Sequence, residues 1–158
     1  MDLRNVRMVS TGRLRAVAFR AEGDEPEATA FERLRAWAEP RGLLDDRASF
    51  LLLGRNDPPP VPGRRGYGYV YMLTVDEGLE AGGVELIELP AATYAVVRAR
   101  LGDMGGRWEA LYRWAEASRY TVTGHGLEEH LSVPGTVAPD EMLFDLWLPV
   151  TDAGRPSN

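Results

Sequence analysis

Both histidines of the chain lie in one short stretch, GHGLEEHL at residues 124–131, with two glutamates between them. Histidine and glutamate are typical of metal sites and of acid–base centres. In a strand, however, His125 and His130 point to opposite faces, and on a helix they lie about 140° apart. Neither geometry lets the two rings share an ion, so we expect no metal site.

Alternation along a strand sorts this stretch into two faces. The glycines and the preceding RYTVT favour a strand over a helix. One face then carries Val122, Glu128 and His130. The other carries His125, Leu127, Glu129 and Leu131. Because the leucine face suits packing under a helix, we expect Glu128 on the open face of the sheet, among aromatic side chains of neighbouring strands.

Apolar periodicity predicts the elements that position these residues. Helices are expected over about 25–40, with Asp24 as its cap, Pro26 in the first turn and Gly42 at its end, and over about 105–118. Runs of aromatic and β-branched residues bounded by Pro and Gly predict strands at 6–20, 47–55, 67–76, 120–131 and 142–150.

The chain resembles itself at a spacing near 77 residues. AFERLRAWAEPRGL (30–43) matches RWEALYRWAEASRY (107–120), and RAVAFRAEGD (15–24) matches YAVVRARLGD (94–103). Such internal similarity predicts a duplicated βαββ module. We therefore expect one α+β domain over 1–152, with modules of about 1–77 and 78–152 and a flexible tail at 153–158. Its eight-stranded antiparallel sheet would carry helices on one face and a ligand cleft on the other.

Composition excludes several kinds of site. The 158 residues include no cysteine, which rules out disulfides, thiol nucleophiles and cysteine-bound metals. The net charge is −6 and no basic stripe occurs, so we expect no nucleic-acid partner. No apolar run of membrane-spanning length is present. We expect a cytoplasmic protein with no membrane partner and no cofactor.

Four segments together resemble a known family. LPAATYAVVRARLGDMGGRWEALYRWAEASRY (89–120) looks like the GyrI-like small-molecule-binding domain, also called the AraC-type effector-binding domain. LEEHL (127–131) is similar to its Phe-Glu-x-Tyr strand, LWLPV (146–150) to its closing Ile-Tyr-Ile-Pro-Val strand, and GRNDPP (54–59) to its Asp-Asn-Pro turn. The resemblance implies a stand-alone, aromatic-lined cleft for lipophilic, cationic small molecules, as in multidrug binding and drug resistance.

The resemblance assigns roles to individual residues. Glu128 matches the glutamate that neutralises cationic ligands, and His130 falls on the tyrosine of the same motif. Trp147 and Tyr69 fall on tyrosines of two further strands. Tyr67 and Tyr71 share a strand face with Tyr69, and Trp108 near the start of its helix could reach the rim of the cleft. The expected ligand-binding residues are thus Glu128, Tyr69, Tyr71, Trp147, His130, Tyr67 and Trp108.

The resemblance leaves three functions open. The first is binding or sequestration of lipophilic cations, with Glu128 as the counter-charge. The second is hydrolysis of electrophilic natural products, in which Glu128 would act as general base. The third is a protein-interaction module of the gyrase-inhibitor type. The sequence favours the first.

Overall fold

The computed structural model describes residues 5–152 and divides the chain into two compact units. The contiguous unit spans Leu14–Leu89, and the split unit combines the residues up to Arg13 with those from Pro90 onward. The bounds of these units differ from those of the predicted modules. The predicted tail at 153–158 lies outside the described residues.

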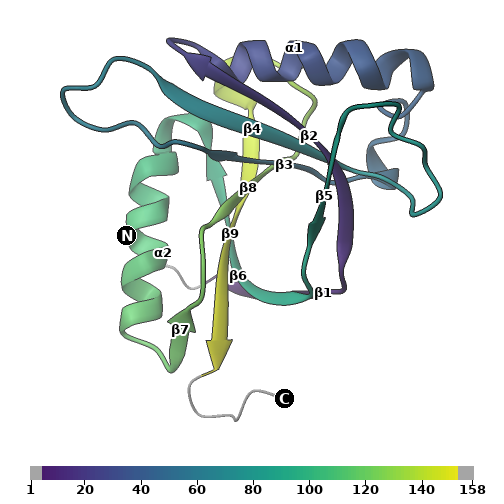
Figure 1. Cartoon of the computed structure of the whole chain (residues 1–158). Coiled ribbons are helices and arrows are strands. Elements are labelled where there is room, and N and C mark those ends of the chain that lie inside the picture. The colour runs from purple at the N-terminus through teal and green to yellow at the C-terminus, as the bar shows by residue number, and fades with distance from the viewer. Residues whose placement is uncertain (1–4, 153–158) are drawn as a thin grey trace. The chain divides into compact units, whose positions relative to one another are not determined.

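The contiguous unit is an antiparallel sheet with one helix on it (Figure 1). Its strands pair in the order β3 (Leu52–Asn56), β4 (Tyr67–Thr74), β2 (Leu14–Gly23) and β5 (Glu85–Leu89). The helix α1 (Pro26–Ala38) contacts β2 and β4, and short 3-10 turns cover Glu39–Arg41 and Arg47–Ser49.

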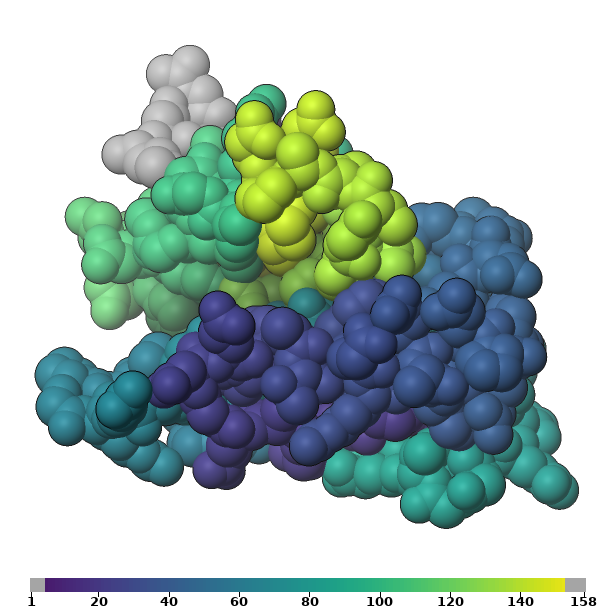
Figure 2. Space-filling view, turned by 90° about the horizontal axis from the view of Figure 1, so that it is seen from above, coloured from purple at the N-terminus to yellow at the C-terminus, as the bar shows by residue number. Residues whose placement is uncertain are grey.

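Apolar spacing explains how α1 packs. Phe31, Leu34 and Trp37 recur at helical intervals and are buried, whereas Glu32 and Arg35 are exposed. Figure 2 shows the solvent-facing side of this part of the chain in blue. Pro26 is the first helical residue, as predicted. The predicted cap is wrong: Glu25, not Asp24, precedes the helix, and it makes no side-chain cap bond. Gly42 follows the last turn with φ of 67°, as its predicted role requires.

The split unit has a similar build. Its sheet runs β1 (Arg7–Thr11), β6 (Ala92–Arg100), β9 (Leu143–Asp152) and β8 (Leu127–His130), and β7 (Tyr120–Val122) also pairs with β9. The helix α2 (Met104–Glu116) packs on this sheet through Leu111 and Ala115, and 3-10 turns cover Leu101–Asp103 and Pro139–Glu141.

The α+β class, the antiparallel strands and the two helices agree with the prediction. Within residues 5–152 there are nine strands rather than eight, and two of the expected strands are each divided in two. The expected strand 6–20 breaks at Gly12 and Arg13, and 120–131 breaks between β7 and β8. The segment 47–51, expected as strand, is mostly a 3-10 turn. The duplication itself stays a prediction.

Candidate functional site

The seven predicted ligand-binding residues are divided between the two units. The split unit holds Glu128, His130, Trp147 and Trp108, and the contiguous unit holds Tyr67, Tyr69 and Tyr71.

The pairing of β8 with β9 fixes which face Glu128 occupies. Glu128 stands opposite Leu146, and His130 stands opposite Phe144. Residues directly opposite in an antiparallel pair share a face, and Leu146 and Phe144 belong to the core that packs on Leu111 of α2. Glu128 and His130 therefore share a face, as predicted, but it is the helix side of the sheet.

This result corrects the expected face of β8. Leu127 and Glu129, expected beneath the helix, lie on the other side, opposite Trp147 and Asp145. Alternation along a strand shows which residues share a face of the sheet, but it does not show which of the two faces the helix covers. Both sides of β8 bear buried residues, with Leu127, Glu129 and His130 all buried, so hydrophobicity alone misassigned the faces.

Glu128 and His130 differ in their exposure. Both lie on the same side of β8, but Glu128 is half-buried whereas His130 is only 5% exposed. The His130 ring meets the Phe144 ring edge-on, with centroids 4.9 Å apart. A half-buried carboxylate thus lies two residues from an aromatic pair on the same face.

Trp147 lies on the face opposite Glu128. Its ring is tilted against Tyr94, with centroids 5.1 Å apart, and only 6% of the residue is exposed. Its indole Nε1 is buried and has no hydrogen-bond partner among residues 5–152. Burial also raises the pKa of the Tyr94 phenol. The structure therefore does not bring Trp147 to the face of β8 that bears Glu128.

A carboxylate that the sequence analysis missed lies near Trp147. Asp145 is 5% exposed and accepts hydrogen bonds from Arg7 Nη2 at 2.8 Å and Arg98 Nε at 3.1 Å. Asp145, and more weakly Glu129, raise the pKa of Arg98. The available signal was a single aspartate within the apolar run MLFDLWLPV, where a buried charge requires partners.

Trp108 lies over the start of β8. It is half-buried on α2 and packs against the core, and its ring occupies the space where a Cβ on Gly126 would lie, with Cζ3 at 2.6 Å from that position. Only glycine at 126 leaves room for this indole.

The three tyrosines form a stripe on the α1 side of β4. Tyr71 contacts Phe31 of α1 with ring centroids 5.4 Å apart, and Tyr69 meets Tyr71 edge-on at 4.9 Å. The Tyr67 hydroxyl donates to the Glu27 carboxylate at the start of α1. The shared strand face of the three tyrosines is thus the one on which α1 packs, not the uncovered face of the sheet.

Glycine also makes room within this stripe. The phenol of Tyr69 lies over Gly54 of β3, with Cζ 2.7 Å from the position of a Cβ there. Tyr69 and Tyr71 are 2% and 3% exposed, whereas Tyr67 at the beginning of the strand is half-buried.

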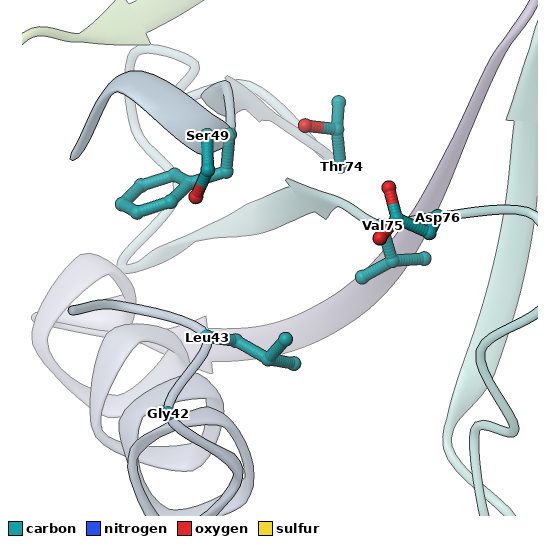
Figure 3. Close-up of a pocket in the computed structure, with 7 residues that line it drawn as sticks. Gly42, Leu43, Ser49, Thr74, Val75 and Asp76 are labelled. Atoms are coloured by element: carbon teal, nitrogen blue, oxygen red, sulfur yellow. The ribbon is translucent and has the colours of Figure 1, made fainter. Parts of the chain in front are cut away.

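A pocket of about 220 Å³ lies elsewhere in the contiguous unit (Figure 3). None of the seven predicted residues lines this pocket. Its lining consists of Gly42, Leu43, Ser49, Phe50, Thr74, Val75 and Asp76. The hydroxyl groups of Ser49 and Thr74 already bond to the backbone, at Asp46 O and Leu51 N. Glu128 does not line this pocket, so the candidate site at Glu128 is a different one.

No group of three or more His, Asp or Glu side chains within residues 5–152 is arranged to hold a metal ion. No helix in the same range is long and apolar enough to cross a membrane.

Several solved structures share this fold. The structure of SAV2435 bound to tetraphenylphosphonium is 15% identical, with a TM-score of 0.55, covering 93% of this chain and 94% of that one. The EcmrR C-terminal domain is 12% identical, with a TM-score of 0.67 and coverage of 96% and 99%. A hydrolase from Listeria innocua is 13% identical, with a TM-score of 0.67 and coverage of 94% and 92%. No curated protein matches the chain by sequence.

At these identities the structures establish a common fold. The family match is independent of them and spans residues 4–151, almost the whole chain. It confirms the resemblance drawn from the sequence motifs. The chain belongs to the family of GyrI-like small molecule binding domains.

Proposed function

We propose that this domain binds lipophilic aromatic cations and that Glu128 supplies the counter-charge. The observation that carries the proposal is the position of Glu128, a half-buried carboxylate on the helix side of β8, on the same face as His130, Phe144 and Leu146. The similarity to SAV2435, which is bound to tetraphenylphosphonium in its structure, supports this ligand class.

Charge and apolar surface both favour this class of ligand. Burying an unpaired cation is costly, so a carboxylate beside apolar and aromatic side chains favours ligands of positive sign. Each aromatic face contributes about 0.5–2 kcal/mol to a cation that lies over it. Apolar area adds about 25 cal/mol per Å² without requiring a particular shape. Broad specificity for ring-bearing cations follows from these terms.

A titration with tetraphenylphosphonium tests the proposal. We expect calorimetry to give micromolar binding to the wild type, and Glu128→Gln to weaken it by about tenfold, or roughly 1.4 kcal/mol. The matched control is Glu109→Gln on α2, which removes the same charge from an exposed glutamate paired with Arg113 at 3.6 Å. Equal affinity in the wild type and Glu128→Gln would refute the role of Glu128.

Hydrolysis is the second candidate. It is favoured by one observation: Glu128 and His130 lie two residues apart on one face of β8, where a carboxylate could deprotonate water and an imidazole could protonate a leaving oxygen. Mass spectrometry of a strained epoxide incubated with the protein tests this candidate. Turnover would yield the diol, and Glu128→Gln would abolish it. Recovery of unchanged epoxide would eliminate this function.

The remaining predicted contacts are tested one at a time. Tyr67, Tyr69, Tyr71, Trp108 and Trp147 stay predictions as ligand contacts, and alanine substitutions assayed with the same cation would rank them. Because Tyr69 and Tyr71 are buried, each variant needs a thermal unfolding curve beside its binding curve.

A further inference from the structure

Glu27 and Tyr67 form a half-buried pair in the contiguous unit. Glu27 lies in the first turn of α1, and Tyr67 is the first residue of β4. The Tyr67 hydroxyl is 2.7 Å from both Glu27 Oε1 and Oε2, so one phenol bridges the two carboxylate oxygens. Both residues keep part of their surface in contact with solvent.

Glu27 differs from nearby carboxylates that form ion pairs with arginine. Arg20 forms ion pairs with Glu85 at 2.8 Å and Asp57 at 2.9 Å, and Arg35 does so with Glu32 at 2.8 Å. Glu27 instead accepts from a neutral phenol, and within residues 5–152 no arginine forms an ion pair with it. The hydrogen bond and the partial positive charge at the start of α1 stabilise the carboxylate, but neither supplies a full positive charge to pair with it.

Aromatic rings lie next to this charge. Tyr67 begins the stripe that continues through Tyr69 and Tyr71, and Phe31 of the same helix packs on Tyr71. A phenol that donates to a carboxylate becomes more electron-rich, which strengthens the attraction between its ring face and a cation. Charge and rings thus occur together within one unit, independently of Glu128.

We propose that Glu27 is a second anionic residue that selects cationic ligands for this domain, with Tyr67 as the ring that it orients. The inference rests on the proposed function and adds, within the contiguous unit, a second anionic residue for the same class of ligand. The ligand class is a ring-bearing organic cation whose charge is spread over the molecule. Such a cation satisfies a half-buried carboxylate without demanding directional hydrogen bonds.

The test compares a cation with a neutral ligand of similar shape. The probes are tetraphenylphosphonium and triphenylphosphine oxide, titrated into the wild type, Glu27→Gln and Glu27→Asp. We expect Glu27→Gln to weaken binding of the cation by about threefold to tenfold while leaving the neutral ligand unchanged, since only a charge is lost. Glu27→Asp keeps the charge and should retain most of the preference for the cation.

A control on the same helix distinguishes a specific effect of the Glu27 charge from the general effect of lowering the negative charge of α1. Glu32→Gln removes one charge from an exposed glutamate of α1, and neither probe should respond to it. Equal weakening of both probes in Glu27→Gln would show a packing role and overturn the inference.

Other outcomes separate this inference from the proposed function. A wild type that binds the cation, weakened by Glu128→Gln but not by Glu27→Gln, overturns the role of Glu27 alone. A wild type that does not bind the cation at all overturns both.

Discussion

Glu128 and Trp147 project from opposite faces of the split unit's sheet, because Glu128 stands opposite Leu146 and Trp147 stands opposite Leu127. The two residues that the sequence motifs place in one cleft therefore have separable effects. Glu128 should act on charge preference and Trp147 on stability.

Replacing Trp147 with leucine tests that separation. Trp147 is 6% exposed and packs on Tyr94, so the truncation should lower the free energy of unfolding by about 2–4 kcal/mol. Urea denaturation measures this loss. The ratio of affinities for tetraphenylphosphonium and triphenylphosphine oxide should stay unchanged in the folded variant. A lost preference with undiminished stability would contradict the separation.

Gly126→Ala should disturb the packing of Trp108. The added methyl group would overlap the indole, so either the ring or the start of β8 must move, at a cost of about 1–3 kcal/mol. Gly124→Ala, two residues earlier, is the control, because its Cβ would meet only Pro149 Cγ at 3.7 Å. Chemical unfolding followed by tryptophan fluorescence should separate the two variants; equal stability would show that Trp108 relocates without cost.

Tyr67 should titrate late and make stability depend on alkaline pH. Its pKa rises from 10.0 to about 12, because burial disfavours the phenolate, Glu27 accepts its hydrogen bond, and the charges of Glu27 and Glu25 repel it. The folded protein holds this proton more tightly than the unfolded chain does. The stability that this tyrosine contributes is therefore complete below about pH 10 and is lost as pH rises towards 12.

Tyrosinate absorbance provides the measurement. One late-titrating signal should be lost in Tyr67→Phe and should move towards the ordinary value in Glu27→Gln, where both the charge and the stronger acceptor are gone. Tyr112→Phe, at an exposed position on α2, should leave this late signal in place. An unchanged late signal in Tyr67→Phe would assign it to another tyrosine.

Asp145→Asn should destabilise the split unit. The buried carboxylate binds two arginines whose side chains are about half exposed, 54% for Arg7 and 57% for Arg98, so solvent moderates the effect. We expect a loss of about 1–3 kcal/mol in the free energy of unfolding. Asp140→Asn, on an exposed 3-10 turn, should have no measurable effect. Similar midpoints for the two variants would show that the Asp145 ion pairs contribute little.

Local patterns predicted the helices and the long strands well. The stripe through Phe31, Leu34 and Trp37 located α1, and the aromatic runs located β4 and β9 to within a few residues. These elements are specified by neighbours in sequence, through helical spacing, Pro26 and Gly42. The family resemblance was carried mostly by other segments, 54–59, 89–120 and 127–131, together with 146–150 within β9.

Long-range pairing was not predictable. Nothing in RMVST indicates that β1 pairs with β6, more than 80 residues away, instead of with its neighbour β2. The sheet faces on which Glu128 and the tyrosine stripe lie depend on such pairings and on which face each helix covers. Alternation of residues along a strand contains no information about either. The partners of the buried Asp145 could not be predicted for the same reason, since Arg7 and Arg98 come from strands far away in the sequence.

The order in which the two units can fold during synthesis follows from the way the chain is divided between them. The contiguous unit is complete once Leu89 has been made, so its sheet can form while the rest is still being translated. β1 is made first but must wait for β6, and β9 is the last strand to arrive. A ribosome stalled far enough beyond residue 89 for the contiguous unit to clear the exit tunnel should thus expose one protease-resistant unit preceded by an unpaired N-terminal segment.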